Sequence, residues 1–292
     1  MTGPVVVGID DFEHSDRLIA TAAGEALARG TSLWLAHAYH GFAPVTPGVE
    51  PSFAPERIVQ GAAQAQLQTA ADKLVAEHPG LHVETAAVTG PAAPALAELS
   101  NPASLLVVGG RGRGGLTGQL LGSVSLRVLA HANCPVLVVR GHGEKATGRV
   151  MVGVDLDTPA TGAPVLEFAF AEAAGRSADV YAFYAWEDPT VLYAYGAQLL
   201  SHDQQLAALK RGREALAAAL EPFKAKYPQV SVTSEVLAGL PSRLLVESTE
   251  LADLLVIGGR PHSGGTDGMR VGAIAHTVLH HAHCPVAVVP ER

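Results

Sequence analysis

The sequence predicts an α/β protein made of two tandem domains, each a parallel β-sheet covered by helices on both faces. Short apolar segments alternate with helical ones along the 292 residues, which is the pattern of parallel strands joined by right-handed crossovers. A stretch from Val107 to Val139 also recurs between Val256 and Val289, with one extra residue in the second copy. A repeat of half the chain indicates two whole domains, because solenoid repeats are far shorter.

Apolar runs and amphipathic periods place the elements of the first half. Val5–Ile9 is a buried strand that ends at Asp10, and Ser15–Ala28 reads as a helix. His40–Pro55 holds four prolines and two glycines, so we expect an irregular loop there. The other predicted elements are the strands Leu33–Ala38, His82–Val88, Leu105–Val108 and Pro135–Val139, and the helices Arg57–Glu77, Ala93–Leu99 and Ser123–His131.

The second half repeats this order of elements after a short linker. We place the first domain at residues 1–141, the linker at 142–148 and the second domain at 149–292. A long helix is expected over Asp203–Lys226. The predicted strands of the second domain are Arg149–Val154, Asp179–Ala185, Ser231–Leu237, Leu254–Ile257 and Pro285–Val289.

Composition narrows the class of protein. Apolar residues make up 48% of the chain and charged residues 16%, with no apolar run of 18 residues that would span a bilayer. No secretory signal is visible. The net charge of −8 and the absence of a basic stripe disfavour nucleic-acid binding. Two cysteines form no disulfide framework, so we expect a reducing, cytoplasmic location.

The groups suited to ligand binding follow the strand ends of the first half. Asp10, Gly90 and Gly109 each come at a carboxyl end, where ligands bind in such sheets. Glycines after a strand let the backbone approach a ligand closely, and the N-terminus of the next helix favours phosphate. Ser123 is a natural helix N-cap, and with Ser125 it adds hydroxyl donors. The alternative is a flexible connection without a ligand.

This glycine loop differs from the two commonest nucleotide motifs. It has no Gly-Lys-Ser/Thr, and the first strand is followed by Asp10-Asp11-Phe12 instead of glycines. Its spacing, Gly-x2-Gly-x9-Gly-Ser, resembles the ATP-binding signature of the universal stress protein family, and the likeness covers nearly the whole chain as two copies. The other matching segments are Val7-Gly8-Ile9-Asp10, His37-Ala38, Val88-x-Gly90 and Cys134-Pro135-Val136-Leu137-Val138-Val139.

The resemblance implies two Rossmann-like (HUP-type) domains with five-stranded parallel sheets, and an ATP-binding regulator of the stress response instead of a turnover enzyme. ATP, with or without Mg²⁺, is the implied ligand, and the regulated protein partner is unknown. The last strands, Val136–Val139 and Val286–Val289, would pair as an internal pseudo-dimer, with a further homodimer of chains left open. The resemblance places adenine and ribose near Asp10, Ala38 and Val88, and phosphates along Gly109, Gly112, Gly122, Ser123, Val124 and Ser125.

The second half departs from this pattern in its loop. Asp155 and Gly239 are kept, but Pro261 stands where the first half has Gly112. Proline has no backbone donor, and Ala273 and Ala275 lack the two serine hydroxyls. We therefore expect a degenerate second half, although Arg260 and Arg270 leave anion binding there open.

Other candidate groups favour structural roles, and we predict no catalytic residue. His276, His280 and Cys284 have a spacing that would suit zinc, but the helix has to end before Pro285, so no metal is expected. Cys134 precedes a buried strand in the same way. The histidines near the crevice, which we expect to be packed or solvated instead of shuttling protons, are His14, His37 and His40. Slow ATP hydrolysis or nucleotidyl transfer, and a nucleotide-free scaffold, remain the alternative functions.

Overall fold

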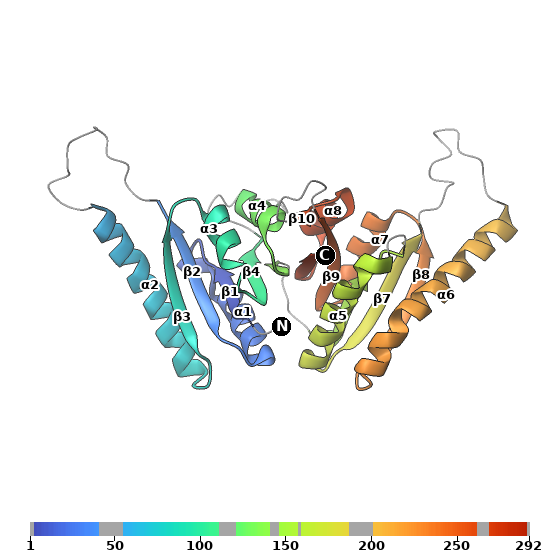
Figure 1. The fold of residues 1–292 in the computed structure, drawn as a ribbon, viewed down its shortest axis with the longest axis horizontal. Coiled ribbons are helices and arrows are strands. Elements are labelled where there is room, and N and C mark those ends of the chain that lie inside the picture. Colours follow the sequence, from blue (N-terminus) through green and yellow to red (C-terminus); the bar gives the residue numbers. More distant parts are fainter. Residues whose placement is uncertain are drawn as a thin grey trace. The chain divides into compact units, whose positions relative to one another are not determined.

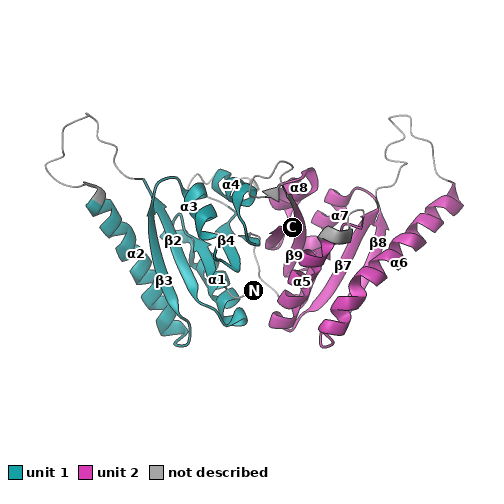
Figure 2. Cartoon of the chain, viewed as in Figure 1, with its two compact units in different colours: residues 1–139 teal, residues 140–292 magenta. Residues whose placement is uncertain are grey.

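The computed structural model describes residues 3–40, 55–110, 121–140, 146–156, 159–186, 201–261 and 269–290. The chain forms two compact units, Met1–Val139 and Arg140–Arg292 (Figure 2). Both units are α/β with parallel sheets (Figure 1), so the predicted fold class is confirmed. Part of the predicted linker, residues 141–145, lies outside the described residues. Arg140 belongs to the second unit, where its guanidinium donates to the carbonyl oxygen of His280 at 2.7 Å.

The sheet of unit 1 has the strand order β3-β2-β1-β4-β5, and all neighbours are parallel. Helices α1 and α2 cover one face of this sheet, while α3 and α4 pack together on the other (Figure 1). The central strands β1 and β4 are buried along nearly their whole length, and their apolar side chains form much of the core. The elements are β1 (Val5–Gly8), η1 (Phe12–His14), α1 (Asp16–Arg29), β2 (Leu33–Tyr39), α2 (Pro55–Glu77), β3 (Val83–Thr89), α3 (Ala92–Leu99), β4 (Leu105–Gly109), α4 (Ser123–His131) and β5 (Val136–Val139).

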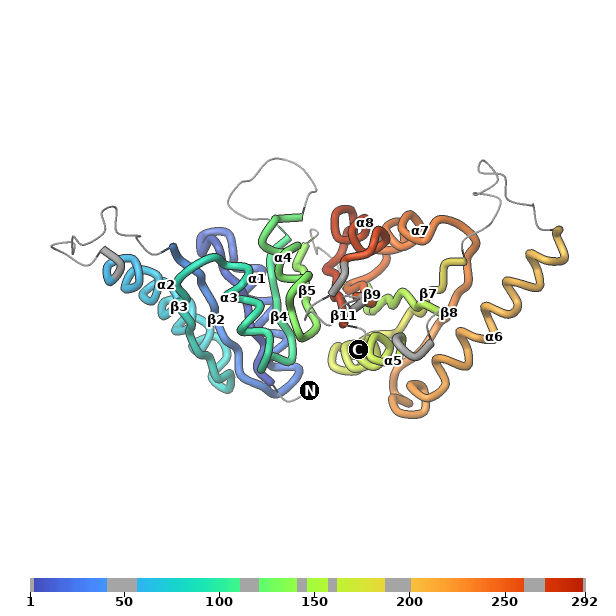
Figure 3. Tube along the Cα trace, turned by 45° about the horizontal axis from the view of Figure 1, so that its top comes forward, coloured from blue at the N-terminus to red at the C-terminus, as the bar shows by residue number. Residues whose placement is uncertain are grey.

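Unit 2 repeats this architecture with the parallel order β11-β9-β6-β7-β8. Figure 3 traces the backbone of this unit, with the long helix α6 beside β8. A short strand, β10, pairs with β9 in the antiparallel direction. None of the described helices is long and apolar enough to cross a membrane. The elements are β6 (Arg149–Gly153), α5 (Pro159–Arg176), β7 (Asp179–Trp186), α6 (His202–Lys226), β8 (Val232–Ala238), α7 (Pro241–Ser248), η3 (Thr249–Leu251), β9 (Leu254–Pro261), β10 (Met269–Arg270), α8 (Ala273–His281) and β11 (Val286–Pro290).

Each sheet reverses its strand order at one place. In unit 1 the chain builds outward from β1 to β3 and then returns to add β4 on the other side of β1. In unit 2 the reversal lies between β6 and β9. Crevices beyond the carboxyl ends of strands at such switch points are the usual ligand sites of open α/β sheets.

The structure corrects two local predictions. Gly258–Pro261, expected as a loop, continues strand β9, and the short elements η1, η3 and β10 were not predicted. Ser123 is the first residue of α4 and not its N-cap, which is Gly122. The extension of β9 follows from pairing with β10 and β11, and such partners cannot be read from a Gly-Gly-Arg-Pro segment alone.

Equivalent helix ends in the two units carry different residues in the left-handed region. Gly30 ends α1 with φ 62°, and Ser177 follows α5 with φ 52°. A side chain in this region costs about 1 kcal/mol. We therefore expect Ser177→Gly to stabilise the protein by about 0.5–1 kcal/mol, measured by urea unfolding.

The matched reverse change is Gly30→Ser in unit 1. Among the residues that the structure describes, a Cβ at Gly30 would meet no atom within 4 Å, so the expected loss of about 1 kcal/mol reflects the backbone alone. A Ser177→Gly variant no more stable than the parent chain would contradict this account.

Candidate functional site

The strand-end residues expected to bind a nucleoside share one row across the sheet of unit 1. Gly8 is in register with Ala36 of β2 and with Val108 of β4. Asp10 comes two residues after Gly8, and Ala38 comes two after Ala36 and is in register with Val88. Asp10 is exposed, while Ala38 and Val88 are half-buried. The structure therefore brings one carboxylate and two small apolar side chains to one edge of the sheet.

Gly90 follows β3 at this edge of the sheet and has a backbone conformation that favours glycine. Its φ is 116°, and its N–H donates to the carbonyl oxygen of Tyr39 at 2.8 Å. Gly239 of unit 2 repeats the arrangement, with φ 153° and a bond of 3.0 Å to the carbonyl oxygen of Trp186. The matched glycines therefore hold the ends of β2 and β7 in the same way.

The glycine-rich loop of unit 1 is anchored at both of its ends. Gly110, directly after β4, donates its N–H to the carbonyl oxygen of Val139 at 2.9 Å. Its own carbonyl oxygen accepts the N–H of Gly122 at 3.2 Å. Residues 111–120, which include the predicted phosphate residue Gly112, lie outside the described residues. The bonds set where α4 begins relative to the end of β4.

Helix α4 starts beside the switch point. Ser123 and Val124 are exposed in its first turn, and the N-cap Gly122 offers no side-chain cap. The first backbone N–H groups of a helix have no partner within the helix and carry partial positive charge. This end of α4 is therefore suited to an anion.

Ser125 plays a different part from its exposed neighbours. It is only 6% exposed, and its hydroxyl donates to the carbonyl oxygen of Gly109 at 2.7 Å. That bond fastens α4 to the end of β4. Ala275, its counterpart in unit 2, has no hydroxyl and cannot make this bond.

In unit 2 the corresponding strand end is built differently. Gly259 is in register with Pro290 of β11, and the backbone of Arg260 and Pro261 pairs with β10. The side chains of Arg260 and Arg270, which left anion binding open, lie outside the described part of the structure. Because β9 extends through this segment, the backbone of the segment takes part in strand pairing.

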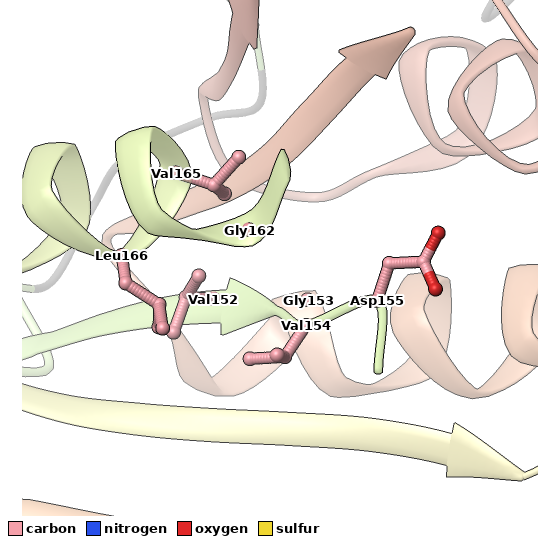
Figure 4. Close-up of a pocket in the computed structure, with 7 residues that line it drawn as sticks. All are labelled: Val152, Gly153, Val154, Asp155, Gly162, Val165 and Leu166. Atoms are coloured by element: carbon pink, nitrogen blue, oxygen red, sulfur yellow. The ribbon is translucent and has the colours of Figure 1, made fainter. Parts of the chain in front are cut away.

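A small recess nevertheless lies beside Asp155, at the end of β6 (Figure 4). Its walls are apolar, and Asp155 supplies its one carboxylate. The recess occupies the place that corresponds to the Asp10 end of β1 in unit 1. Its lining residues come from β6, the residues after it and α5: Val152, Gly153, Val154, Asp155, Gly162, Val165 and Leu166.

The candidate zinc ligands do not assemble. The rings of His276 and His280 lie 4.3 Å apart, and burial, followed by the nearby His276, lowers the pKa of His280. Burial raises the pKa of the Cys284 thiol to about 12, which opposes the thiolate that zinc requires. Within the described ranges, the one cluster of potential metal ligands is a surface group formed by Asp11, Glu13 and His14.

That surface group already has internal partners. Asp11 accepts the N–H of Glu13 at 3.0 Å and contacts Nδ1 of His14 at 2.8 Å. The bond to Asp11 is the main cause that raises the pKa of His14. Asp11 therefore caps η1, and the cluster has a structural explanation.

His37 is packed in the structure, as the sequence favours over a proton-shuttle role. It is 7% exposed on β2, and its Nδ1 lies 2.8 Å from the carbonyl oxygen of Ile9. Sequence patterns contain no signal for this bond, because its two residues are 28 positions apart.

A doubly wound parallel sheet with a glycine-rich strand-to-helix loop at its switch point defines a Rossmann-like α/β protein. The model of the universal stress protein family matches residues 1–140 and again residues 147–290. The chain belongs to the universal stress protein family, as a tandem member.

Relatives agree with this assignment. A universal stress protein of Mycobacterium tuberculosis (strain ATCC 25618 / H37Rv) is 34% identical over 303 residues, which cover 98% of this chain and 97% of the relative. The crystal structure of a universal stress protein from Archaeoglobus fulgidus has the same fold, with a TM-score of 0.68 and 19% identity over 99% of this chain and 96% of that one.

Proposed function

We propose that this protein binds ATP in unit 1 and acts as a nucleotide-dependent regulator of the stress response in the cytoplasm. One observation carries the proposal: the row that holds Asp10, Ala38 and Val88 and the N-terminus of α4 follow the carboxyl ends of strands of one sheet, with Asp10 after β1 and α4 after β4 on the two sides of its switch point. A nucleotide needs both parts of this site, because its nucleoside is recognised by polar and apolar side chains and its phosphates by N–H groups with positive partial charge. Pairing of the two units through their last strands, and a protein partner, are part of the same proposal.

The chain offers a distinct group to each part of the nucleotide. The exposed Asp10 carboxylate accepts hydrogen bonds from ribose hydroxyls. Ala38 and Val88 present small, half-buried apolar side chains to the purine. The first turn of α4 presents N–H groups and positive partial charge to phosphates. Mg²⁺, when bound, would neutralise charge on the phosphates.

A binding role suits these residues better than turnover. The Ser125 hydroxyl is buried and bonded to Gly109, and Nδ1 of His37 is bonded to Ile9. Nucleophilic and acid–base catalysis need such groups within reach of the substrate. Both are instead engaged in holding strand ends, which supports a regulator. Steady-state turnover with ATP tests this directly, and multiple turnovers would favour the enzyme alternative.

We expect ATP to bind with a stoichiometry near one per chain, in unit 1. The strand end of unit 2 is extended into pairing with β10, and Ala273 and Ala275 replace the serines. Isothermal titration calorimetry measures the stoichiometry. Two equivalent sites per chain would show that the β9 extension does not prevent binding and would contradict the assignment to unit 1.

A further inference from the structure

His37 lies between the two groups that we assign to the nucleoside. It comes directly before Ala38 on β2, and its ring contacts the backbone directly before Asp10. The Ile9 carbonyl can only accept, so Nδ1 of His37 carries the hydrogen of this bond.

Ile9, the residue before Asp10, is consequently held through both its backbone N–H and its carbonyl group. The N–H of Ile9 donates to the carbonyl oxygen of Ala36 at 2.8 Å, and its carbonyl oxygen accepts from His37 at 2.8 Å. Phe12 also packs against the imidazole, with ring centroids 5.3 Å apart and an interplanar angle of 54°. The imidazole is thereby fixed between the end of β1 and η1.

Unit 2 keeps the first of these bonds and replaces the second residue. Val154 donates its N–H to the carbonyl oxygen of Phe183 at 2.9 Å, as Ile9 does to Ala36. The position of His37 is taken by Tyr184. The ring of Tyr184 faces α6, where a Cβ on Gly212 would lie 3.4 Å from it. The imidazole bond therefore belongs to the unit with the proposed ATP site.

We propose that His37 is a positioning residue for the nucleoside half of this site. By holding the Ile9 carbonyl, it sets the direction in which Asp10 leaves the sheet and its distance from Ala38. This inference rests on the proposed function, since it concerns the same site. Under this inference His37 affects the affinity for the nucleoside part of the ligand and not the affinity for its phosphates.

The experiment compares His37→Leu, His37→Asn and His37→Gln. Leucine removes the donor, whereas the asparagine amide places a donor where Nδ1 stands and the longer glutamine places it further out. We expect His37→Leu to weaken adenosine and ATP by the same factor, about tenfold. Inorganic triphosphate, measured by competition with ATP, should bind unchanged. His37→Asn should stay near the wild-type affinity, and His37→Gln should resemble leucine.

Controls separate positioning from a general loss of structure. Tyr184→Leu makes the matched truncation in unit 2, and we expect no change in ATP affinity. If His37→Leu fails to fold, the contrast between asparagine and glutamine carries the test. Two results would overturn this inference and leave the proposed function standing. One is a folded His37→Leu protein that binds adenosine as tightly as the wild type does. The other is a His37→Leu protein that loses as much affinity for triphosphate as for adenosine. A wild-type protein that binds neither ATP nor adenosine would overturn the proposed function and this inference with it.

Discussion

Gly122→Glu is expected to lower the affinity for ATP by about a hundredfold or more while the chain keeps its fold. Gly122 caps α4 with φ −65° and ψ 148°, a conformation open to any residue, so the change brings no backbone strain. A carboxylate at this point occupies the proposed phosphate position and repels phosphate charge. Calorimetric titration with ATP, together with thermal unfolding, measures both parts of the expectation.

Two further variants make this result specific. Gly272→Glu is the matched change at the N-cap of α8, where φ is −65° and no atom of the described residues lies within 4 Å of an added Cβ. We expect it to leave ATP affinity unchanged. Asp10→Ala should weaken adenosine and ATP alike, whereas Gly122→Glu should spare adenosine. Wild-type ATP affinity in a folded Gly122→Glu protein would show that the phosphates lie elsewhere.

Asp253→Ala is expected to destabilise unit 2 by about 2–3 kcal/mol. The Asp253 carboxylate accepts the N–H groups of Thr147 at 2.6 Å, Gly148 at 2.7 Å and Arg149 at 3.2 Å, as well as the Thr147 hydroxyl at 3.0 Å. These bonds hold the start of β6 against the start of β9. Alanine leaves three backbone donors to solvent, and urea unfolding measures the loss.

Graded substitutions test whether the carboxylate is responsible. Asp253→Asn keeps one acceptor oxygen and should cost about half as much as alanine. At the equivalent position in unit 1, Ser104 donates to the carbonyl oxygen of Pro4 at 3.2 Å. Ser104→Ala removes that single bond, so we expect a loss of about 1 kcal/mol. An Asp253→Ala protein as stable as the parent chain would be incompatible with this role.

Local pattern was enough to predict the regular elements of the fold. Val5–Val7 are fully buried in β1, as the uninterrupted apolar run predicted. The predicted bounds of Ser123–His131 are those of α4. Such elements are readable because side-chain periodicity and strand-end glycines are properties of neighbouring residues. Their repetition in the second half predicted the tandem architecture.

Parts of the candidate site were not readable, because their partners are distant in sequence. The Ser125 hydroxyl was expected at the phosphates but is bonded to Gly109, 16 residues away. Gly258–Pro261 has loop composition yet forms strand because β10 and β11 pair with it.

The sequence by itself determined the family, the two α/β units and the strand ends at which a ligand would bind. Each of these depends on residue types at short spacing, which local sterics and hydrophobic burial convert directly into strands, turns and helices. Only the tertiary structure decided which polar groups remain exposed at those ends. That outcome depends on hydrogen bonds such as His37 to Ile9, since a buried donor takes whichever acceptor the packed sheet brings within reach.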